Sequence, residues 1–111
     1  MGTDEFDLIS RYLTPLAANE AARGLADDAA VFDVPEGFHG VVSTDALVSG
    51  VHFPTDATGD IVARRALGSA LSDLAAMGAK PTGCLLTWGI GPDWEDKFFT
   101  RFADAFKADL S

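Results

Sequence analysis

Four carboxylates stand out because they border or interrupt apolar segments, or lie among small residues of a helical pattern. They are Asp27, Asp28, Asp45 and Asp73. Carboxylates that converge repel one another and lose hydration, so a cluster of them needs cations, protons or basic partners. Mg²⁺ suits such a cluster because it takes hard oxygen ligands, keeps several waters and commonly binds substrate phosphates. Ser43 and Thr44, directly before Asp45, could add hydroxyl or carbonyl oxygens.

The same residues also allow a plain structural interpretation. Asp27 and Asp28 would then form a solvated turn, and Asp73 would face water or cap a neighbouring element. His52, which follows an apolar run, is by itself more typical of a loop histidine than of a ligand, although an imidazole also suits contact with phosphate. The residues alone leave both interpretations open.

Other catalytic chemistries find little support. The single cysteine, Cys84, has no His or Cys at metal-ligand spacing, and its apolar surroundings in the sequence predict a small buried side chain. Neither a Walker phosphate loop nor a Gly-x-Gly-x-x-Gly opening a helix is present. Arg64 and Arg65 have two interpretations, as phosphate contacts or as surface partners of Asp60 or of a neighbouring chain.

The elements that must position these residues alternate in type. Apolar residues at helical spacing predict helices over residues 3–18, with a break near Pro15, and over 60–77 and 93–110. Asp60 is the expected N-cap of the second helix and Gly78 its expected end, and the third helix has one broad aromatic face that is expected to face the core. Short apolar runs bounded by turn residues predict three strands, over residues 29–34, 40–48 and 82–90. This order predicts an α+β fold, in which a small mixed or antiparallel sheet carries helices on one face.

The composition is that of a small acidic domain. The 111 residues include 8 Lys or Arg and 17 Asp or Glu, which gives a formal net charge of −9, and 48% are hydrophobic. This length supports one domain with a core. The negative charge argues against nucleic acid and membrane partners, since both bind clustered basic residues. Without a long apolar run or a basic signal segment, a cytoplasmic location is expected.

Three segments together resemble the thiamine-monophosphate kinases, a branch of the aminoimidazole ribonucleotide synthetase superfamily. The segments, in the order and approximate spacing of that family, are Leu-Ala-Asp-Asp-Ala-Ala (25–30), Ser-Thr-Asp-Ala-Leu-Val-Ser-Gly-Val-His-Phe (43–53) and Leu-Ser-Asp-Leu-Ala-Ala-Met-Gly-Ala-Lys-Pro (71–81). The third segment is shared loosely across the superfamily, which includes selenophosphate synthetase. The second segment favours the thiamine branch.

The resemblance implies a function and an assembly. Members of the family transfer the γ-phosphoryl group of ATP to thiamine monophosphate, with several Mg²⁺ ions bridging carboxylates and phosphates. Their N-terminal α+β domain pairs with its twin, sheet against sheet, so a homodimer is expected. The resemblance covers about the first third of the family's usual length. It therefore implies that residues 1–111 form a single N-terminal domain that binds Mg²⁺ and ATP, and that the family's C-terminal domain is absent.

The resemblance also assigns roles to particular residues. Those that match metal ligands of the family are Asp28, Ser43, Thr44, Asp45 and Asp73. His52 matches a substrate contact, and Asp27 is a further candidate for the metal or phosphate site. The family's Gly-Asp-Asp is altered by Ala26, and Ala70 replaces a common Asn, but neither change removes a carboxylate. Two alternatives remain: a noncatalytic dimerisation or binding module, and a sibling ATP-dependent synthetase. Activity of the isolated chain is left open.

Overall fold

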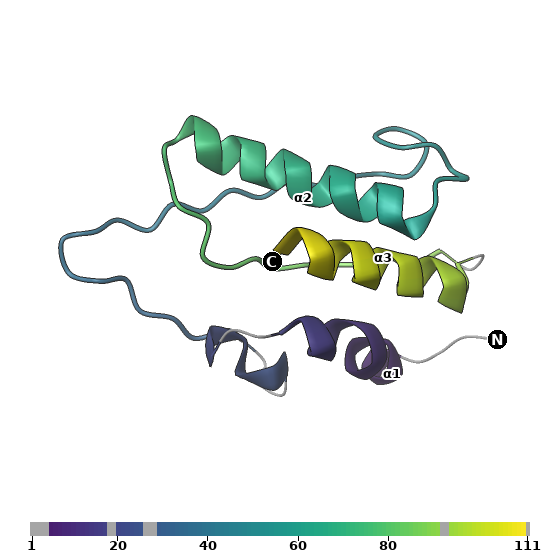
Figure 1. The fold of residues 1–111 in the computed structure, drawn as a ribbon, viewed down its shortest axis with the longest axis horizontal. Coiled ribbons are helices and arrows are strands. Elements are labelled where there is room, and N and C mark those ends of the chain that lie inside the picture. Colours follow the sequence, from purple (N-terminus) through teal and green to yellow (C-terminus); the bar gives the residue numbers. More distant parts are fainter. Residues whose placement is uncertain (1–4, 18–19, 26–28, 92–93, 111) are drawn as a thin grey trace. The chain divides into compact units, whose positions relative to one another are not determined.

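The computed structural model describes residues 5–17, 20–25, 29–91 and 94–110. These residues divide into two compact units, Met1–Gly40 and Val41–Ser111, and each unit is treated by itself. Figure 1 shows the helices of both units. None of the helices in the described ranges combines the length and the apolar composition needed to cross a bilayer.

The first unit consists of short helical pieces. They are α1 (Glu5–Leu8), the π-helical turn η1 (Ile9–Leu13) and the 3₁₀ segments η2 (Thr14–Leu16) and η3 (Glu20–Leu25). The Thr14 N–H donates to the carbonyl of Ile9, five residues back, which is the π-helical register. Pro15 has no N–H to donate, so a regular α-helix cannot continue through it. The predicted break near Pro15 is therefore found.

The predicted α+β fold is wrong for the described residues, which contain helices and no β-strand (Figure 1). The segments predicted as strands, 29–34, 40–48 and 82–90, form no ladder with one another. One isolated bridge, between Ser49 and Phe53, is present in this part of the chain. The predicted small sheet with helices on one face is therefore replaced by helices and irregular segments.

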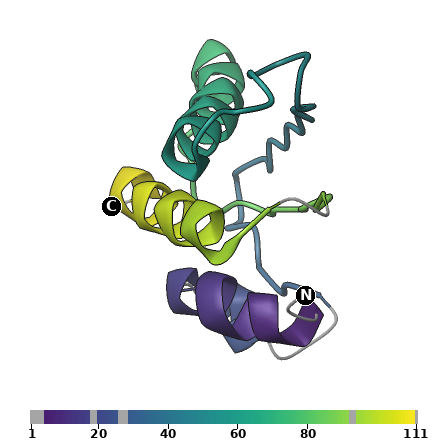
Figure 2. The same cartoon turned by 90° about the vertical axis from the view of Figure 1, so that its right-hand side faces the viewer.

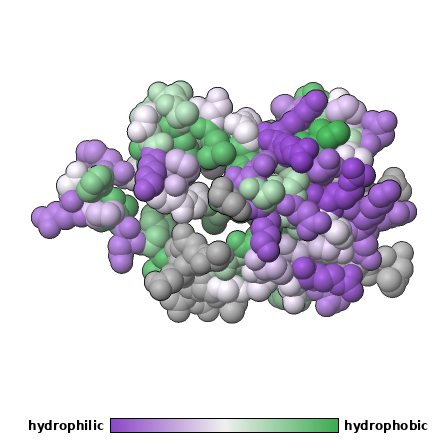
Figure 3. All heavy atoms as spheres, in the orientation of Figure 1, coloured by the Kyte–Doolittle hydropathy of each residue, from purple (hydrophilic) through white to green (hydrophobic). Residues whose placement is uncertain are grey.

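The physical reason is a lack of cross-strand partners. A high β propensity means that side chains fit a pleated, half-buried surface, and it does not supply the second strand. Independent stability needs about three or more paired strands with a covered apolar face. Apolar side chains of these segments remain exposed instead, Val42 by 80% and Leu85 by 88%. Hydrophobic residues, in green, are visible on the face of the molecule drawn in Figure 3. The proposed pairing of domains through a sheet loses its basis as well.

The second unit is built on two helices that lie side by side, as both views show (Figures 1 and 2). They are α2 (Gly59–Ala76) and α3 (Asp96–Leu110). Helix α2 follows Thr58, whose extended backbone marks the N-cap, whereas Asp60 had been expected there. It ends at Ala76, and Gly78 stops it as predicted, because a left-handed φ of +67° lets the next N–H, that of Ala79, donate to the Leu74 carbonyl at 3.0 Å.

The core of the second unit lies between α2 and α3. Its buried helical residues are Gly59, Val62, Ala63 and Leu67 on α2 and Phe99, Phe102, Ala105 and Phe106 on α3. Their spacing places them on one face of each helix, as predicted for the aromatic face of the last helix. Trp88, which precedes α3, also packs on this core, with its ring centroid 5.2 Å from that of Phe99 and 5.0 Å from that of Phe102.

Gly59 permits the close approach of the two helices. A Cβ atom added at this position would meet the carbonyl oxygen of Phe98 and would lie 2.7 Å from the amide nitrogen of Phe102. Both atoms belong to the backbone, so no side-chain rotation could make room for it. Any larger residue would force α2 and α3 apart at this end.

Candidate functional site

One face of α2 carries three polar anchors. Arg65, Ser69 and Asp73 are spaced by four residues, so they lie in one row along the helix, here called the polar stripe. Each of the three is hydrogen-bonded to a residue of the segment 43–52. The polar stripe therefore holds the stretch of chain in which the sequence predicted most of the site.

Two serine–aspartate pairs join this segment to α2. The Ser43 Oγ donates to Asp73 Oδ2 at 3.1 Å, and the Ser69 Oγ donates to Asp45 Oδ2 in a close contact. Residues two apart in an extended segment are separated by about 7 Å, and residues four apart in a helix by about 6 Å along the axis. Because these two distances are similar, both pairs can form together. The segment runs antiparallel to α2, since Ser43 pairs with Asp73 and Asp45 pairs with the earlier residue Ser69.

The two carboxylates have neutral partners. Asp45 and Asp73 are exposed, each accepts a hydrogen bond from a hydroxyl, and no Lys or Arg of the described ranges forms an ion pair with either. Thr44, between Ser43 and Asp45, is also exposed and takes no part in either pair. The negative charge of both carboxylates is thus left uncompensated by the protein around them.

His52 lies in a tight turn at the end of the same segment. Its Nδ1 accepts a hydrogen bond from the Val48 N–H at 2.8 Å, and its carbonyl oxygen accepts one from Arg65 Nη1 at 3.0 Å. The N–H of Gly50, with φ +80°, donates to the Phe53 carbonyl at 2.7 Å and closes the turn. The polar stripe therefore anchors His52 through Arg65 as well as the two aspartates.

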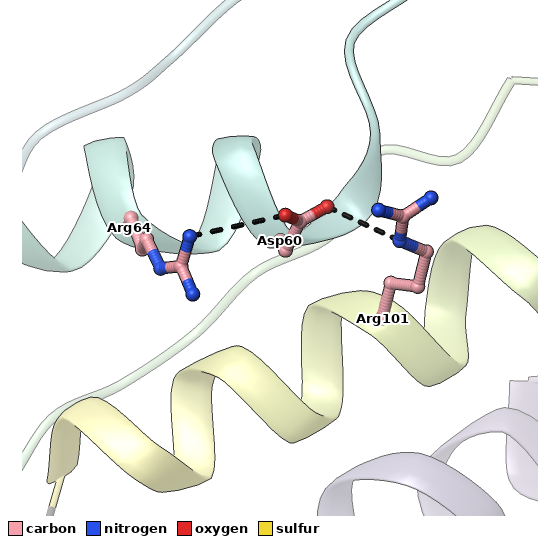
Figure 4. A network of polar contacts seen from close by, with 3 residues as sticks. All are labelled: Asp60, Arg64 and Arg101. Carbon is pink, nitrogen blue, oxygen red and sulfur yellow. Dashed lines mark ion pairs between the residues drawn. The ribbon is translucent and has the colours of Figure 1, made fainter.

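A separate charged cluster joins the beginnings of α2 and α3 (Figure 4). Asp60 Oδ1 lies 3.3 Å from Arg101 Nε, and Asp60 Oδ2 lies 3.9 Å from Arg64 Nη1. A hydrogen bond from the Thr58 side chain, aided by the backbone N–H of Asp60 and by both guanidinium groups, lowers the pKa of the Asp60 carboxyl against a partly opposing effect of desolvation. Arg64 is thus a surface partner of Asp60, one of its two predicted roles.

An open pocket of about 290 Å³ adjoins this cluster. It is lined by residues 55–59 and by Trp94, Glu95, Lys97, Phe98 and Arg101. None of the residues predicted for the metal or substrate site lines it. The pocket and the polar stripe are therefore distinct features of the second unit.

Comparison with known proteins supplies the family. The family model described as "AIR synthase related protein, N-terminal domain" matches residues 26–110. The chain belongs to this family. The chain is also similar to the thiamine-monophosphate kinases of Caulobacter vibrioides (46% identical over 92 residues), Escherichia coli K12 (37% over 107) and Salmonella typhimurium (36% over 113). The resemblance found in the sequence is thereby confirmed.

These matches cover the chain far better than they cover the relatives. They include 80%, 95% and 100% of this chain but 26%, 33% and 34% of the three kinases, in the same order. The chain thus spans between a quarter and about a third of the length of these relatives. No solved structure matches it.

The structure brings together only part of the predicted site. Ser43, Asp45 and His52 are hydrogen-bonded to side chains of α2, one of which is Asp73, and no three His, Cys, Asp or Glu side chains of the described ranges converge as metal ligands. Asp27 and Asp28, which the sequence assigned to the same site, lie outside the described residues. The oxygen donors that are present match the ligand preference of Mg²⁺, which also accepts waters and phosphate oxygens.

The sequence did not identify two members of the polar stripe, Arg65 and Ser69, as hydrogen-bond partners of the predicted site residues. The spacing of Arg65, Ser69 and Asp73 by four residues was a readable signal of a shared helix face.

Cys84 also departs from expectation, because its side chain is exposed rather than buried. Partial desolvation raises the pKa of the Cys84 thiol, which disfavours a reactive thiolate.

Proposed function

We propose that this chain supplies the Mg²⁺- and phosphate-binding part of a thiamine-phosphate kinase. The observation that carries the proposal is the polar stripe, which holds Asp45 and Asp73 on one side of α2 with their charge uncompensated. The named relatives supply the reaction: transfer of a phosphoryl group from ATP to thiamine monophosphate. The wider assignment to a sibling synthetase has no comparable support among these relatives.

The residues of the chain would divide the work of binding. Asp45 and Asp73 would hold Mg²⁺ together with Ser43, Thr44 and Asp28. Asp27 would be a further contact of the same metal or phosphate site. Bound Mg²⁺ would neutralise phosphate charge and polarise the phosphoryl group being transferred. His52 would orient the phosphate of thiamine monophosphate.

The reaction needs positioning more than covalent participation by the protein. A terminal oxygen of thiamine monophosphate attacks the γ-phosphorus of ATP, and the bond from that phosphorus to the ADP oxygen breaks. The products are thiamine diphosphate and ADP. No side chain has to form a covalent intermediate, which agrees with a site built from oxygen donors and one imidazole.

Substituting Asp45 tests the proposal directly in the full-length protein. Asp45→Asn removes a charge but keeps the size of the side chain, so phosphoryl transfer should fall by at least about 100-fold over a Mg²⁺ titration. Asp109→Asn is the matched control, because Asp109 is exposed on α3 and far along the sequence from the polar stripe. Equal rates for wild type and Asp45→Asn at every Mg²⁺ concentration would show that the metal assignment is wrong.

We further propose a homodimeric, cytoplasmic enzyme. The dimer is supported by large exposed apolar side chains, which a second copy of the chain would cover. Val42, Val51 and Leu85 of the second unit are among them. The mass of the full-length protein in solution tests the dimer, and a monomer at enzyme-assay concentrations would count against it. A noncatalytic module is favoured instead if calorimetry of the full-length protein shows no heat with Mg²⁺ or Mg²⁺-ATP.

A further inference from the structure

His52 is bonded at two atoms that have different consequences for its chemistry. The ring nitrogen Nδ1 accepts the Val48 N–H at 2.8 Å, and the carbonyl oxygen accepts Arg65 Nη1 at 3.0 Å. We propose that Arg65 is a positioning residue: it fastens the turn that fixes His52 in the Nε2–H tautomer, ready to donate to a phosphate oxygen of the substrate. The substrate part of this inference rests on the proposed function.

The tautomer follows from the bond at Nδ1. A nitrogen that accepts an N–H hydrogen bond uses its lone pair and carries no proton. The neutral imidazole has one N–H, which must then be on Nε2. Nε2 is therefore a donor, and a donor is what an anionic phosphate oxygen requires. The opposite tautomer would present a lone pair to the phosphate and would leave the Val48 N–H without its acceptor.

The turn that brings His52 Nδ1 next to the Val48 N–H is stabilised by hydrogen bonds between its own backbone groups. It is also held by burial of Phe53 and by the hydrogen bond from Arg65. The N–H groups of Val51 and His52 both donate to the Val48 carbonyl, at 3.0 and 2.9 Å. Phe53, 6% exposed, buries its side chain next to His52 in the sequence. The exposed imidazole has no such packing, so the Arg65 bond is what ties the His52 backbone to α2.

Arg65 also relates His52 to the carboxylates. It precedes Ser69 by one turn of α2, which corresponds to about 6 Å along the helix axis. Ser69 in turn holds Asp45. A rigid helix thus spaces the imidazole and the carboxylate from one another, although His52 and Asp45 are both on an irregular segment. Loss of the Arg65 contact should free the turn while leaving the aspartates in place.

The neighbouring arginine offers a matched control. Arg65→Met and Arg64→Met remove the same charge and the same donors one residue apart, but Arg64 pairs with Asp60 rather than with His52 (Figure 4). Both variants are made in the full-length protein labelled with ¹⁵N-histidine, and His52→Gln identifies the His52 signals. Spectra that correlate the ring nitrogens with the carbon-bound protons show directly which nitrogen is protonated.

We expect wild type and Arg64→Met to show Nε2 protonated and Nδ1 unprotonated at a pH where the ring is neutral. Arg65→Met should show a mixture of tautomers, and its KM for thiamine monophosphate should rise about five- to tenfold with little change in kcat. Arg65→Lys keeps one donor and should restore part of both effects. Unchanged folding is checked by the circular dichroism spectrum.

Three results would overturn the inference. They are a protonated Nδ1 in the wild type, identical His52 signals in Arg65→Met and Arg64→Met, and an altered spectrum without any change in KM. Failure of the proposed function is a different observation, namely no phosphorylation of thiamine monophosphate by the wild type. The spectra would still decide whether Arg65 positions His52.

Discussion

The two faces of α2 differ in how much water reaches them. Toward α3, Val62, Ala63 and Leu67 are at most 7% exposed and belong to the core of the second unit. On the polar stripe, Arg65 and Asp73 are exposed, and their hydrogen bonds are open to solvent. One helix thus carries a face that holds the second unit together and a face that arranges polar groups.

The difference in burial translates into a difference in energy. Burying one large apolar side chain stabilises a fold by about 1.5–3 kcal/mol, whereas a typical hydrogen bond contributes about 0.5–1.5 kcal/mol. Changes on the α3 side should therefore act mainly on stability. Changes on the polar stripe should act mainly on binding and turnover.

The largest effect on stability is expected at Gly59. Gly59→Ala places a Cβ against the backbone of Phe98 and Phe102, and separating the helices should cost about 3 kcal/mol of unfolding free energy. Chemical denaturation measures this loss. Gly68→Ala on the same helix is the control, since a Cβ there meets no atom within 4 Å.

Gly68→Ala should stabilise the protein by up to about 1 kcal/mol, because alanine is the better helix former. The two variants are the same substitution with opposite expected signs. If Gly59→Ala and Gly68→Ala change the unfolding free energy in the same direction and by the same amount, then close helix packing at Gly59 does not limit stability.

A smaller effect on stability but a clear effect on activity is expected at Ser69. Ser69→Ala removes the donor to Asp45 and should cost about 1 kcal/mol or less in unfolding free energy. Under the proposed function, phosphoryl transfer by the full-length protein should fall about tenfold, because a carboxylate that holds Mg²⁺ is less well oriented once it loses its hydrogen bond. Steady-state kinetics and denaturation are measured side by side.

Ser72→Ala serves as the control for Ser69→Ala. Ser72 is exposed on α2 and outside the polar stripe, so both its stability and its activity should stay near the wild-type values. A large loss of stability in Ser69→Ala, equal to that of Gly59→Ala, would contradict the distinction between the two faces.

The smallest effect is expected at Asp60, whose pKa is lowered below the usual 3.8 by the Thr58 side chain first and by Arg101 and Arg64 to a lesser extent. A lowered pKa means that the ionised carboxyl favours the folded state. That stability is present above the unfolded pKa and is lost as the pH falls through the folded one.

Thr58→Val should raise the pKa of the Asp60 carboxyl more than Arg64→Met does, in line with the order of the contributions. A ¹³C NMR titration of the Asp60 carboxyl below pH 5 measures both shifts. Larger movement in Arg64→Met than in Thr58→Val would mean that the ion pair, rather than the hydroxyl, dominates. The effect on stability should be slight because the guanidinium groups of Arg64 and Arg101 are exposed, by 63% and 44%, so water and salt screen both ion pairs.

Local patterns carried much of the information about α2 and α3. Gly78 ends α2 as expected, and Phe99, Phe102 and Phe106 face the core as their spacing indicates. The spacing of four between Asp60 and Arg64 also favours the pair that is found. All of these depend on residues within one or two helical turns, where a periodic backbone relates sequence distance to spatial distance.

The strand segments show where local patterns were insufficient. Residues 40–48 have a composition suited to a strand, yet the described residues offer no ladder partner, and the segment lies along α2 through two serine–aspartate pairs. Propensity describes the backbone that a residue tolerates, whereas pairing needs a second segment at hydrogen-bonding distance. Periodicity and spacing in the sequence therefore could not predict the hydrogen-bond partners of Asp45 and Asp73.

The sequence by itself determined the family, the two long helices and the aromatic core face. Tertiary structure decided that Arg65 binds the carbonyl of His52 and that Ser69 holds Asp45. The reason is distance along the chain. Helical periodicity relates residues up to a few turns apart, but contacts between residues 13 to 30 positions apart depend on how the intervening turn folds back onto the helix.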